Sequence, residues 1–142
     1  MIIDNNLYLS NAQANILAQA TYPSTNVIDL TQLTYRVAYN NPMWLICRVT
    51  TALTDAAGAA RLNVAICTNN TADATTPNIF WDTPALLTVA VCILNYEICA
   101  MRLPDRFLER YLLMVYTVSA ADLTGGAITT FLTPDKPEPF LL

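Results

Sequence analysis

Tyr111-Leu-Leu-Met-Val-Tyr-Thr-Val118 carries apolar or aromatic side chains at both alternating positions of an expected β-strand. One face would present Leu112, Met114, Tyr116 and Val118, and the other Tyr111, Leu113 and Val115. A strand that is apolar on both faces must be covered on both faces. Its eight residues are too few for an average helix, and its tyrosine, valine and threonine content favours a pleated surface. We therefore place this strand at the centre of an all-β fold.

Two clearly patterned segments precede this strand. Residues 44–53 alternate, with Leu45, Cys47, Val49 and Leu53 on one face. In residues 61–68, Leu62, Val64 and Ile66 also share a face. Because a short segment containing Gly58 joins the two, the pattern predicts a hairpin with a loose connection.

Weaker signals complete the set of expected elements. Strands are predicted over residues 24–30, from 79 to a stop or sheet edge at Pro84, over 96–103 and over 127–133. The run 85–94 fits a buried strand or a helix, and its β-branched residues favour the strand. Residues 12–20 predict at most one or two helical turns before Pro23, and Gly125-Gly126 predicts a turn after the central strand. Residues 31–41 and 69–78 have the composition of loops.

About eight short strands separated by turn signals predict a jelly-roll-like antiparallel β-sandwich. The 142 residues are enough for a single domain, residues 1–142. Its two ends read as extended arms, at about 1–15 and at 134–142, and the second contains three prolines. We expect the C-terminal arm to dock on a neighbour, because it ends in Phe140-Leu-Leu142.

The composition points to burial against other subunits. Apolar residues make up 54% and charged residues 13% of the chain, against roughly 45–50% and about 25% in typical soluble domains. The richest apolar run, residues 85–94, is shorter than the roughly 20 residues of a membrane-spanning helix. We therefore expect this run in the core and expect no membrane partner. The first residues lack the basic region of a secretory signal, which predicts synthesis and retention in a cytosol. The remaining apolar excess predicts an interaction surface.

Charge and residue types argue against several chemistries. The net charge is −4, and the single lysine and six arginines form no basic stripe, so we expect no nucleic-acid partner. The chain has no histidine, which disfavours triad hydrolases, and we expect neither an enzyme nor a cofactor. Asp105 and Glu109 stand beside Arg106 and Arg110, where local ion pairing is the simplest interpretation.

The four cysteines, Cys47, Cys67, Cys92 and Cys99, lie inside apolar runs without a Cys-x-x-Cys spacing. Buried free thiols are favoured over a disulfide framework, and no metal site is expected. Tyr35, Tyr39, Trp44 and Trp81 are candidates for an aromatic platform that binds sugar, or for ordinary core and rim packing. A carbohydrate- or receptor-binding module is therefore the alternative function.

Several strings distributed over the chain resemble the small cement proteins of short-tailed bacteriophages. They are Met1-Ile-Ile-Asp4, Leu9-Ser10, Ala12-Gln-Ala14, Ser24-Thr-Asn-Val-Ile-Asp-Leu30, Arg110-Tyr-Leu112, Tyr116-Thr-Val118 and Gly126-Ala-Ile-Thr129. The resemblance implies a jelly-roll-like fold and oligomers on the outer face of an icosahedral capsid, with contacts that staple adjacent major-capsid subunits. The four cysteines and the turn at residues 106–109 depart from that family.

These observations together predict a structural virion protein, a capsid cement or decoration protein made in the host bacterial cytoplasm. Its expected partners are the major capsid protein and further copies of itself, as a homodimer or homotrimer. The expected contact residues lie in the two arms: Ile2, Ile3, Leu7, Leu9, Pro137, Pro139, Phe140, Leu141 and Leu142.

Overall fold

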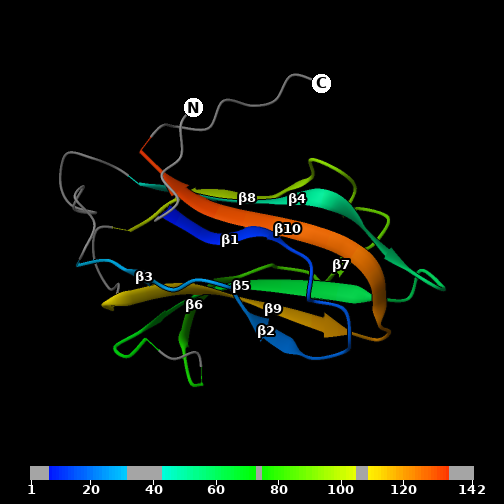
Figure 1. Ribbon diagram of the computed structural model, residues 1–142, viewed down its shortest axis with the longest axis horizontal. Helices are drawn as coiled ribbons and strands as arrows, with labels where there is room; N and C mark the ends of the chain where they lie inside the picture. The colour runs from blue at the N-terminus through cyan, green and yellow to red at the C-terminus, as the bar shows by residue number, and fades with distance from the viewer. Residues whose placement is uncertain (1–6, 32–42, 73–74, 105–108, 135–142) are drawn as a thin grey trace.

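A computed structural model describes residues 7–31, 43–72, 75–104 and 109–134, and two antiparallel β-sheets stack face to face in it (Figure 1). The four-stranded sheet has the order β1-β10-β4-β8, and the six-stranded sheet has β2-β9-β5-β6 with β3 and β7 attached to it. The strands are β1 (Tyr8–Gln13), β2 (Thr21–Pro23), β3 (Ile28–Asp29), β4 (Trp44–Asp55), β5 (Arg61–Asn69), β6 (Asn78–Asp82), β7 (Leu87–Thr88), β8 (Glu97–Arg102), β9 (Tyr111–Ser119) and β10 (Leu123–Thr133). This strand order is that of a jelly roll, which confirms the predicted sandwich.

The strand predicted to be central is β9, and it lies inside its sheet between β2 and β5. Its inner face enters the main core through Leu112, Met114, Tyr116 and Val118. On its outer face Leu113 is fully buried beside Ala65 and Cys67, whereas Val115 is only half-buried. The second sheet therefore covers one face of β9, and neighbouring side chains cover the other face in part.

The predicted hairpin between residues 44–53 and 61–68 is wrong. Both segments are strands, β4 and β5, but β4 pairs with β10 and β8, and β5 pairs with β9, β6 and β7 in the opposite sheet. Their apolar faces meet across the core, as alternation requires, although the backbones do not pair. Asp55 shapes the crossing, because its carboxylate oxygens accept hydrogen bonds from the Gly58 and Ala60 backbone N–H groups at 2.6 and 2.7 Å.

The turn predicted at Gly125-Gly126 is also misplaced. Both glycines lie within β10, and the chain reverses earlier, between Ser119 and Leu123, where Ala120 has a φ of +67°. The pairing of β10 with β4 shifts register around the two glycines. Gly126 has a φ of +129° and faces Leu53 closely, so this bulge requires a residue without a Cβ.

The N-terminal region holds less helix than predicted, and its extended arm contains one short strand, β1. Residues 8–13 form β1, which pairs with β10, and no helix follows in residues 14–20. The segment predicted as a strand over 24–30 contributes only β3, while β2 ends at Pro23 before it. Between them the backbone N–H groups of Ser24 and Asn26 donate to Met114 and Leu9, in opposite sheets, at 2.8 Å each. This crossing explains why the segment cannot pair continuously as one strand.

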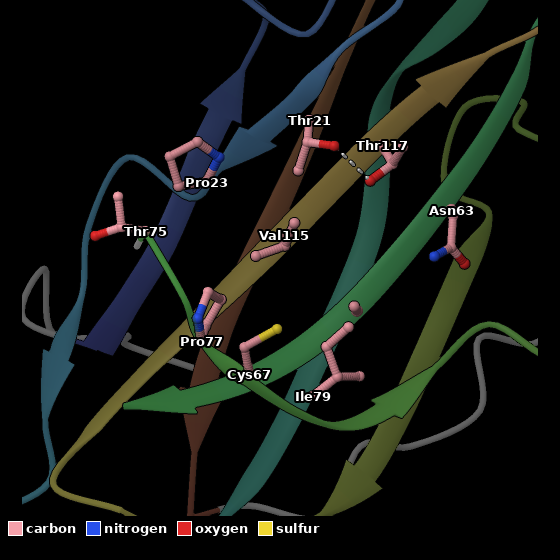
Figure 2. A pocket seen from close by; sticks show the side chains of 10 residues that line it. Thr21, Pro23, Asn63, Cys67, Thr75, Pro77, Ile79, Val115 and Thr117 are labelled. Atoms are coloured by element: carbon pink, nitrogen blue, oxygen red, sulfur yellow. Dashed lines mark hydrogen bonds between the residues drawn. The ribbon is translucent and has the colours of Figure 1, made fainter. Parts of the chain in front are cut away.

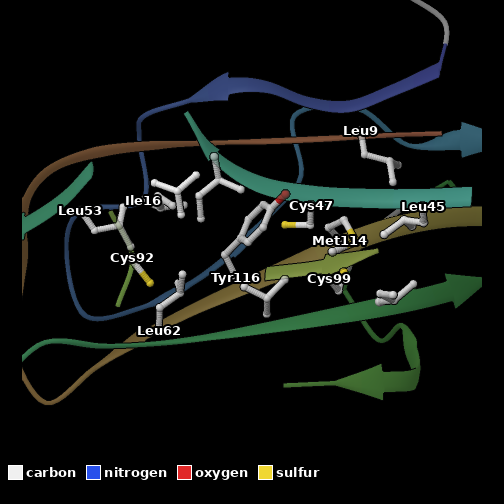
Figure 3. Packing of buried hydrophobic residues seen from close by; sticks show 14 of the residues in the cluster. Leu9, Ile16, Leu45, Cys47, Leu53, Leu62, Cys92, Cys99, Met114 and Tyr116 are labelled. Atoms are coloured by element: carbon white, nitrogen blue, oxygen red, sulfur yellow. The ribbon is translucent and has the colours of Figure 1, made fainter. Parts of the chain in front are cut away.

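A buried chain of hydroxyl groups links β1, β9 and β10 through Tyr116, which Figure 3 shows among the core residues. Ser10 Oγ donates to Gln13 Oε1 at 2.7 Å, so its single proton is used. Tyr116 must then donate to Ser10 at 2.8 Å, and Thr130 must donate to Tyr116 at 2.9 Å. Burial raises the pKa of Tyr116, which keeps its hydroxyl protonated and able to donate. The chain therefore runs in one direction, from Thr130 to Gln13.

Candidate functional site

The run 85–94, predicted as a buried strand, is instead mostly a surface loop. Within it only β7, Leu87–Thr88, pairs as a strand, with Arg61 and Leu62 of β5. The rest turns back on itself through short-range bonds such as that from the Val91 N–H to the Thr88 carbonyl at 3.1 Å. The prediction failed because a continuous apolar run shows no period, so it does not reveal which side chains will find a core to enter.

We define residues 84–95 as the apolar loop. It carries four of the six exposed large hydrophobic side chains of the described residues: Leu86, Val91, Ile93 and Leu94, with 55, 41, 59 and 58% of their surface exposed. An exposed group of this kind is typical of a binding surface rather than of an isolated molecule.

The backbone beneath these side chains is held against β4. Cys92 is fully buried, and its carbonyl accepts a hydrogen bond from Leu53 at 3.0 Å. Asn95 donates to the Val49 carbonyl at 2.9 Å, and its φ of +66° turns the chain into β8. The exposed side chains therefore stand on an anchored framework.

A concave surface lies on the outer face of the six-stranded sheet (Figure 2). It is a pocket of about 350 Å³ lined by Thr21, Pro23, Asn63, Ala65, Cys67, Thr75, Pro77, Ile79, Val115 and Thr117. The hydroxyls of Thr21 and Thr117 lie 3.2 Å apart at one end, and Ile79 is 61% exposed. The described residues of the lining include no aromatic ring, so they do not provide the stacking surface on which sugar binding usually depends.

The predicted aromatic platform is not assembled by the described residues. Trp44 belongs to β4 in one sheet, and Trp81 belongs to β6 in the other, where it packs against the main core. Tyr35 and Tyr39 lie outside the described residues.

Two of the predicted contact residues lie in or against the core. Leu9 is completely buried, and Leu7 is half-buried against the main cluster. Both therefore stabilise this chain itself, because β1 is part of a sheet rather than part of a free arm. The other predicted contact residues are outside the described part of the chain: Ile2, Ile3, Pro137, Pro139, Phe140, Leu141 and Leu142.

The described charged residues near the central strand pair across the fold rather than locally. Arg110 contacts Asp29 of β3 with an Nη2 to Oδ2 distance of 2.8 Å. The Glu109 carboxylate accepts hydrogen bonds from the side chains of Thr68, Asn70 and Asn78, and so fixes the loop before β6. Asp105 and Arg106 are outside the described residues.

The Asp29 to Arg110 ion pair predicts a dependence of stability on pH. Hydrogen bonds from Arg110 and then Thr31 lower the pKa of Asp29 from 3.8 to about 2. The folded-state pKa is depressed, so the stabilisation is complete above the unfolded-state pKa and is lost as the pH falls through about 2. We expect Asp29→Asn to lower the melting temperature slightly between pH 5 and 7, and we expect the difference to shrink toward pH 2 and to vanish below it. Thermal unfolding of both proteins across this range measures it, and a difference independent of pH would contradict it.

All four cysteines are buried free thiols, as predicted. Burial raises the pKa of the Cys67 and Cys92 thiols to about 11, and it also raises the pKa of Cys47. Because the thiolate is the reactive form, these groups are poor nucleophiles near neutral pH. Among the described residues no three histidine, cysteine, aspartate or glutamate side chains gather in a way that could hold a metal ion. The described chain also contains no helix of the length and apolarity needed to cross a membrane.

Comparison with known proteins adds one finding. No curated protein matches this chain. A family model named Bbp16 matches residues 9–132, a range that begins in β1 and ends in β10. The match covers both sheets of the jelly roll and the apolar loop, and the chain belongs to the Bbp16 family.

Proposed function

We propose that this protein is a capsid cement protein, a structural virion component that binds the outer face of the major capsid lattice as a homo-oligomer and stabilises it. The apolar loop is the observation on which this proposal depends, because it exposes four large hydrophobic side chains on an anchored backbone. The resemblance of the sequence to phage cement proteins supports the same function, and the name of the Bbp16 family suggests a phage-related protein.

The expected energetics fit such a role. Burying one exposed valine, leucine or isoleucine side chain stabilises an interface by roughly 1.5–3 kcal/mol. A loop with four such side chains supplies a modest contact for each copy, which is then repeated over every equivalent site of a shell. A protein that binds only the assembled lattice stabilises that state by mass action. The protein would be made in the host bacterial cytoplasm and found on the capsid surface.

We also propose that residues near the two ends of the chain contribute contacts. Ile2, Ile3 and residues 137–142 remain candidate contacts with the major capsid protein or with a neighbouring copy. Leu7 and Leu9 are withdrawn, because they pack in and against the core.

Replacing Ile93 and Leu94 together with serine tests the proposed contact. We expect the concentration needed for half-occupancy of cement-free capsids to rise at least tenfold, since two apolar contacts are lost. The melting temperature should change little, because both side chains are more than half exposed. Co-sedimentation of labelled protein with capsids measures occupancy. Ile79→Ser is the matched control, because Ile79 is 61% exposed but lies on β6, outside the loop.

Two results would count against the proposal. If the double variant occupies capsids as well as the unmodified protein and the Ile79→Ser control does not, the contact lies on the outer face of the six-stranded sheet rather than on the apolar loop. Failure of the unmodified protein to bind capsids, together with saturable binding on a glycan array, would support the carbohydrate- or receptor-binding alternative.

A further inference from the structure

In the described part of the chain, the sheet edges are formed by β1 and β8 in one sheet and by β2, β3, β6 and β7 in the other, and all except β8 are blocked against pairing with another chain. β3 and β7 have only two residues each. In β1 the Leu9 carbonyl accepts the backbone N–H of Asn26 at 2.8 Å, and Ala12 has a φ of +49°. β2 has three residues and ends at Pro23. β6 lies between Pro77 and Pro84 in the sequence. Short length, bulges and proline are the usual protection of sheet edges.

β8 is the exception. Its sequence, Glu97-Ile-Cys-Ala-Met-Arg102, contains no proline, and among the described strands it pairs only with β4. Figure 1 shows it along the margin of the four-stranded sheet. Its pairing with β4 is irregular only between Cys47 and Arg48, toward the Glu97 end, so the regular stretch from Cys99 to Arg102 is a template for another strand.

The hydrogen bonds show which backbone groups point outward from β8. Leu103 donates its N–H to the Met43 carbonyl at 2.9 Å, so residue 103 directs its polar groups toward β4. Directions alternate along a strand, so Met101 and Cys99, opposite Leu45 and Cys47, do the same. The N–H and C=O of Ala100 therefore point away from β4, toward the open edge.

The charged ends of β8 share one face. Arg102 lies opposite Trp44, and Glu97 lies opposite Arg48, because a bulge shifts the register after Cys47. Residues 44 and 48 of β4 point to the outer face of the sheet, so both charges point there too. Glu97 and Arg102 are exposed, while the Arg48 guanidinium lies over the Phe131 ring at 5.6 Å.

We propose that a second copy of this chain pairs with β8 through its own β8, antiparallel, about a twofold axis that passes beside Ala100. Each Ala100 then exchanges its outward N–H and C=O with the other Ala100, which is a hydrogen-bonded antiparallel pair. Glu97 of each copy falls beside Arg102 of the other, so the strand is complementary to itself in charge. The two four-stranded sheets become one continuous sheet. This proposal specifies the self-association within the proposed function and rests on it.

Charge reversal tests the pairing. In analytical ultracentrifugation we expect the unmodified protein to be a dimer, and we expect Glu97→Arg and Arg102→Glu each to raise the dimer dissociation constant at least tenfold. Each single variant places like charges together at both ends of the interface. Mixing the two single variants should restore a dimer, because every contact in the mixed dimer joins opposite charges. A Glu97 to Arg102 contact within one chain could not be restored by mixing.

Ala100→Pro provides a second, independent variant. It removes only the N–H that points outward, and proline is tolerated on an edge strand in that orientation. We expect it to be monomeric, while Ala100→Ser remains a dimer, and circular dichroism with thermal unfolding reports whether each variant is folded. A monomeric unmodified protein at 100 μM, or dimers in both single variants and in Ala100→Pro, would overturn the proposal.

Capsid co-sedimentation separates this inference from the proposed function. If the unmodified protein is monomeric in solution, and if it and the Ala100→Pro variant bind capsids equally well, the β8 dimer is wrong and the proposed cement function still stands. If the protein forms the β8 dimer but does not bind capsids, the cement function is wrong and the β8 pairing still stands.

Discussion

Gly126→Ala is expected to lower the free energy of unfolding by about 3 kcal/mol or more. Gly126 adopts a φ of +129°, which side-chain-bearing residues rarely tolerate. A Cβ at this position would overlap Leu53 Cδ2 and lie 2.9 Å from the Leu53 Cα. A leucine methyl group can rotate away, but a backbone atom of β4 moves only with its strand. Backbone strain and overpacking therefore act together.

Chemical denaturation of three alanine variants measures this effect. Gly58→Ala is the matched control, because Gly58 also has a positive φ, +70°, but open space where its Cβ would be. It should lose about 1–2 kcal/mol from backbone strain alone. Gly125→Ala, whose Cβ would meet only Thr54 Oγ1 at 3.1 Å, isolates mild crowding without positive φ. Equal losses at Gly126 and Gly58 would show that contact with Leu53 contributes nothing.

Tyr116→Phe is expected to lower the free energy of unfolding by about 2–3 kcal/mol. The ring remains in the core, so hydrophobic burial is nearly unchanged. The loss arises because the hydroxyl both donates to Ser10 and accepts from Thr130, at 2.8 and 2.9 Å. Without it two buried hydroxyl groups each lose a partner in a site where water does not replace it.

Tyr22→Phe is the control for this substitution. Its hydroxyl donates to the Ala18 carbonyl at 2.9 Å in an exposed setting, where water can take its place, so the expected loss is below about 1 kcal/mol. A double-mutant cycle with Ser10→Ala should show coupling of about 1 kcal/mol, since the two side chains share one bond. Similar losses in Tyr116→Phe and Tyr22→Phe would mean that the buried chain adds no stability.

The sequence predicts the fold class well because alternation directly records which faces are buried. The apolar faces of β4, β5 and β9 were all identified, and all three meet in the core. Alternation does not record which strand is the hydrogen-bonded neighbour, and a strand facing another across the core carries the same pattern as one beside it. For this reason the pairing of β4 with β5 was wrong. The prediction of a turn at the two glycines of β10 was wrong for a related reason, because a bulge and a turn both favour glycine, which adopts positive φ without strain.

The candidate site was harder to predict from the sequence than the fold class. The run 85–94 was identified as the most apolar segment, but hydrophobicity alone does not distinguish a core strand from an exposed loop. Cys92 enters the core, whereas Ile93 and Leu94 do not, and only the three-dimensional fold sets this division. Residues 96–103 were predicted as a strand, although nothing local shows that it lies at an edge. With the edge known, the opposite charges at Glu97 and Arg102 become informative.

The hydrogen bonds from Leu53 and Asn95 that join the apolar loop to β4 have a consequence for association. Ordering a flexible backbone costs about 1–2 kcal/mol for each residue, and a floppy loop would lose that amount on meeting its partner. In this protein the backbone of the loop is already ordered when the single chain folds. The loop is pre-organised, so burial of Ile93 and Leu94 would be converted into affinity with little entropic loss.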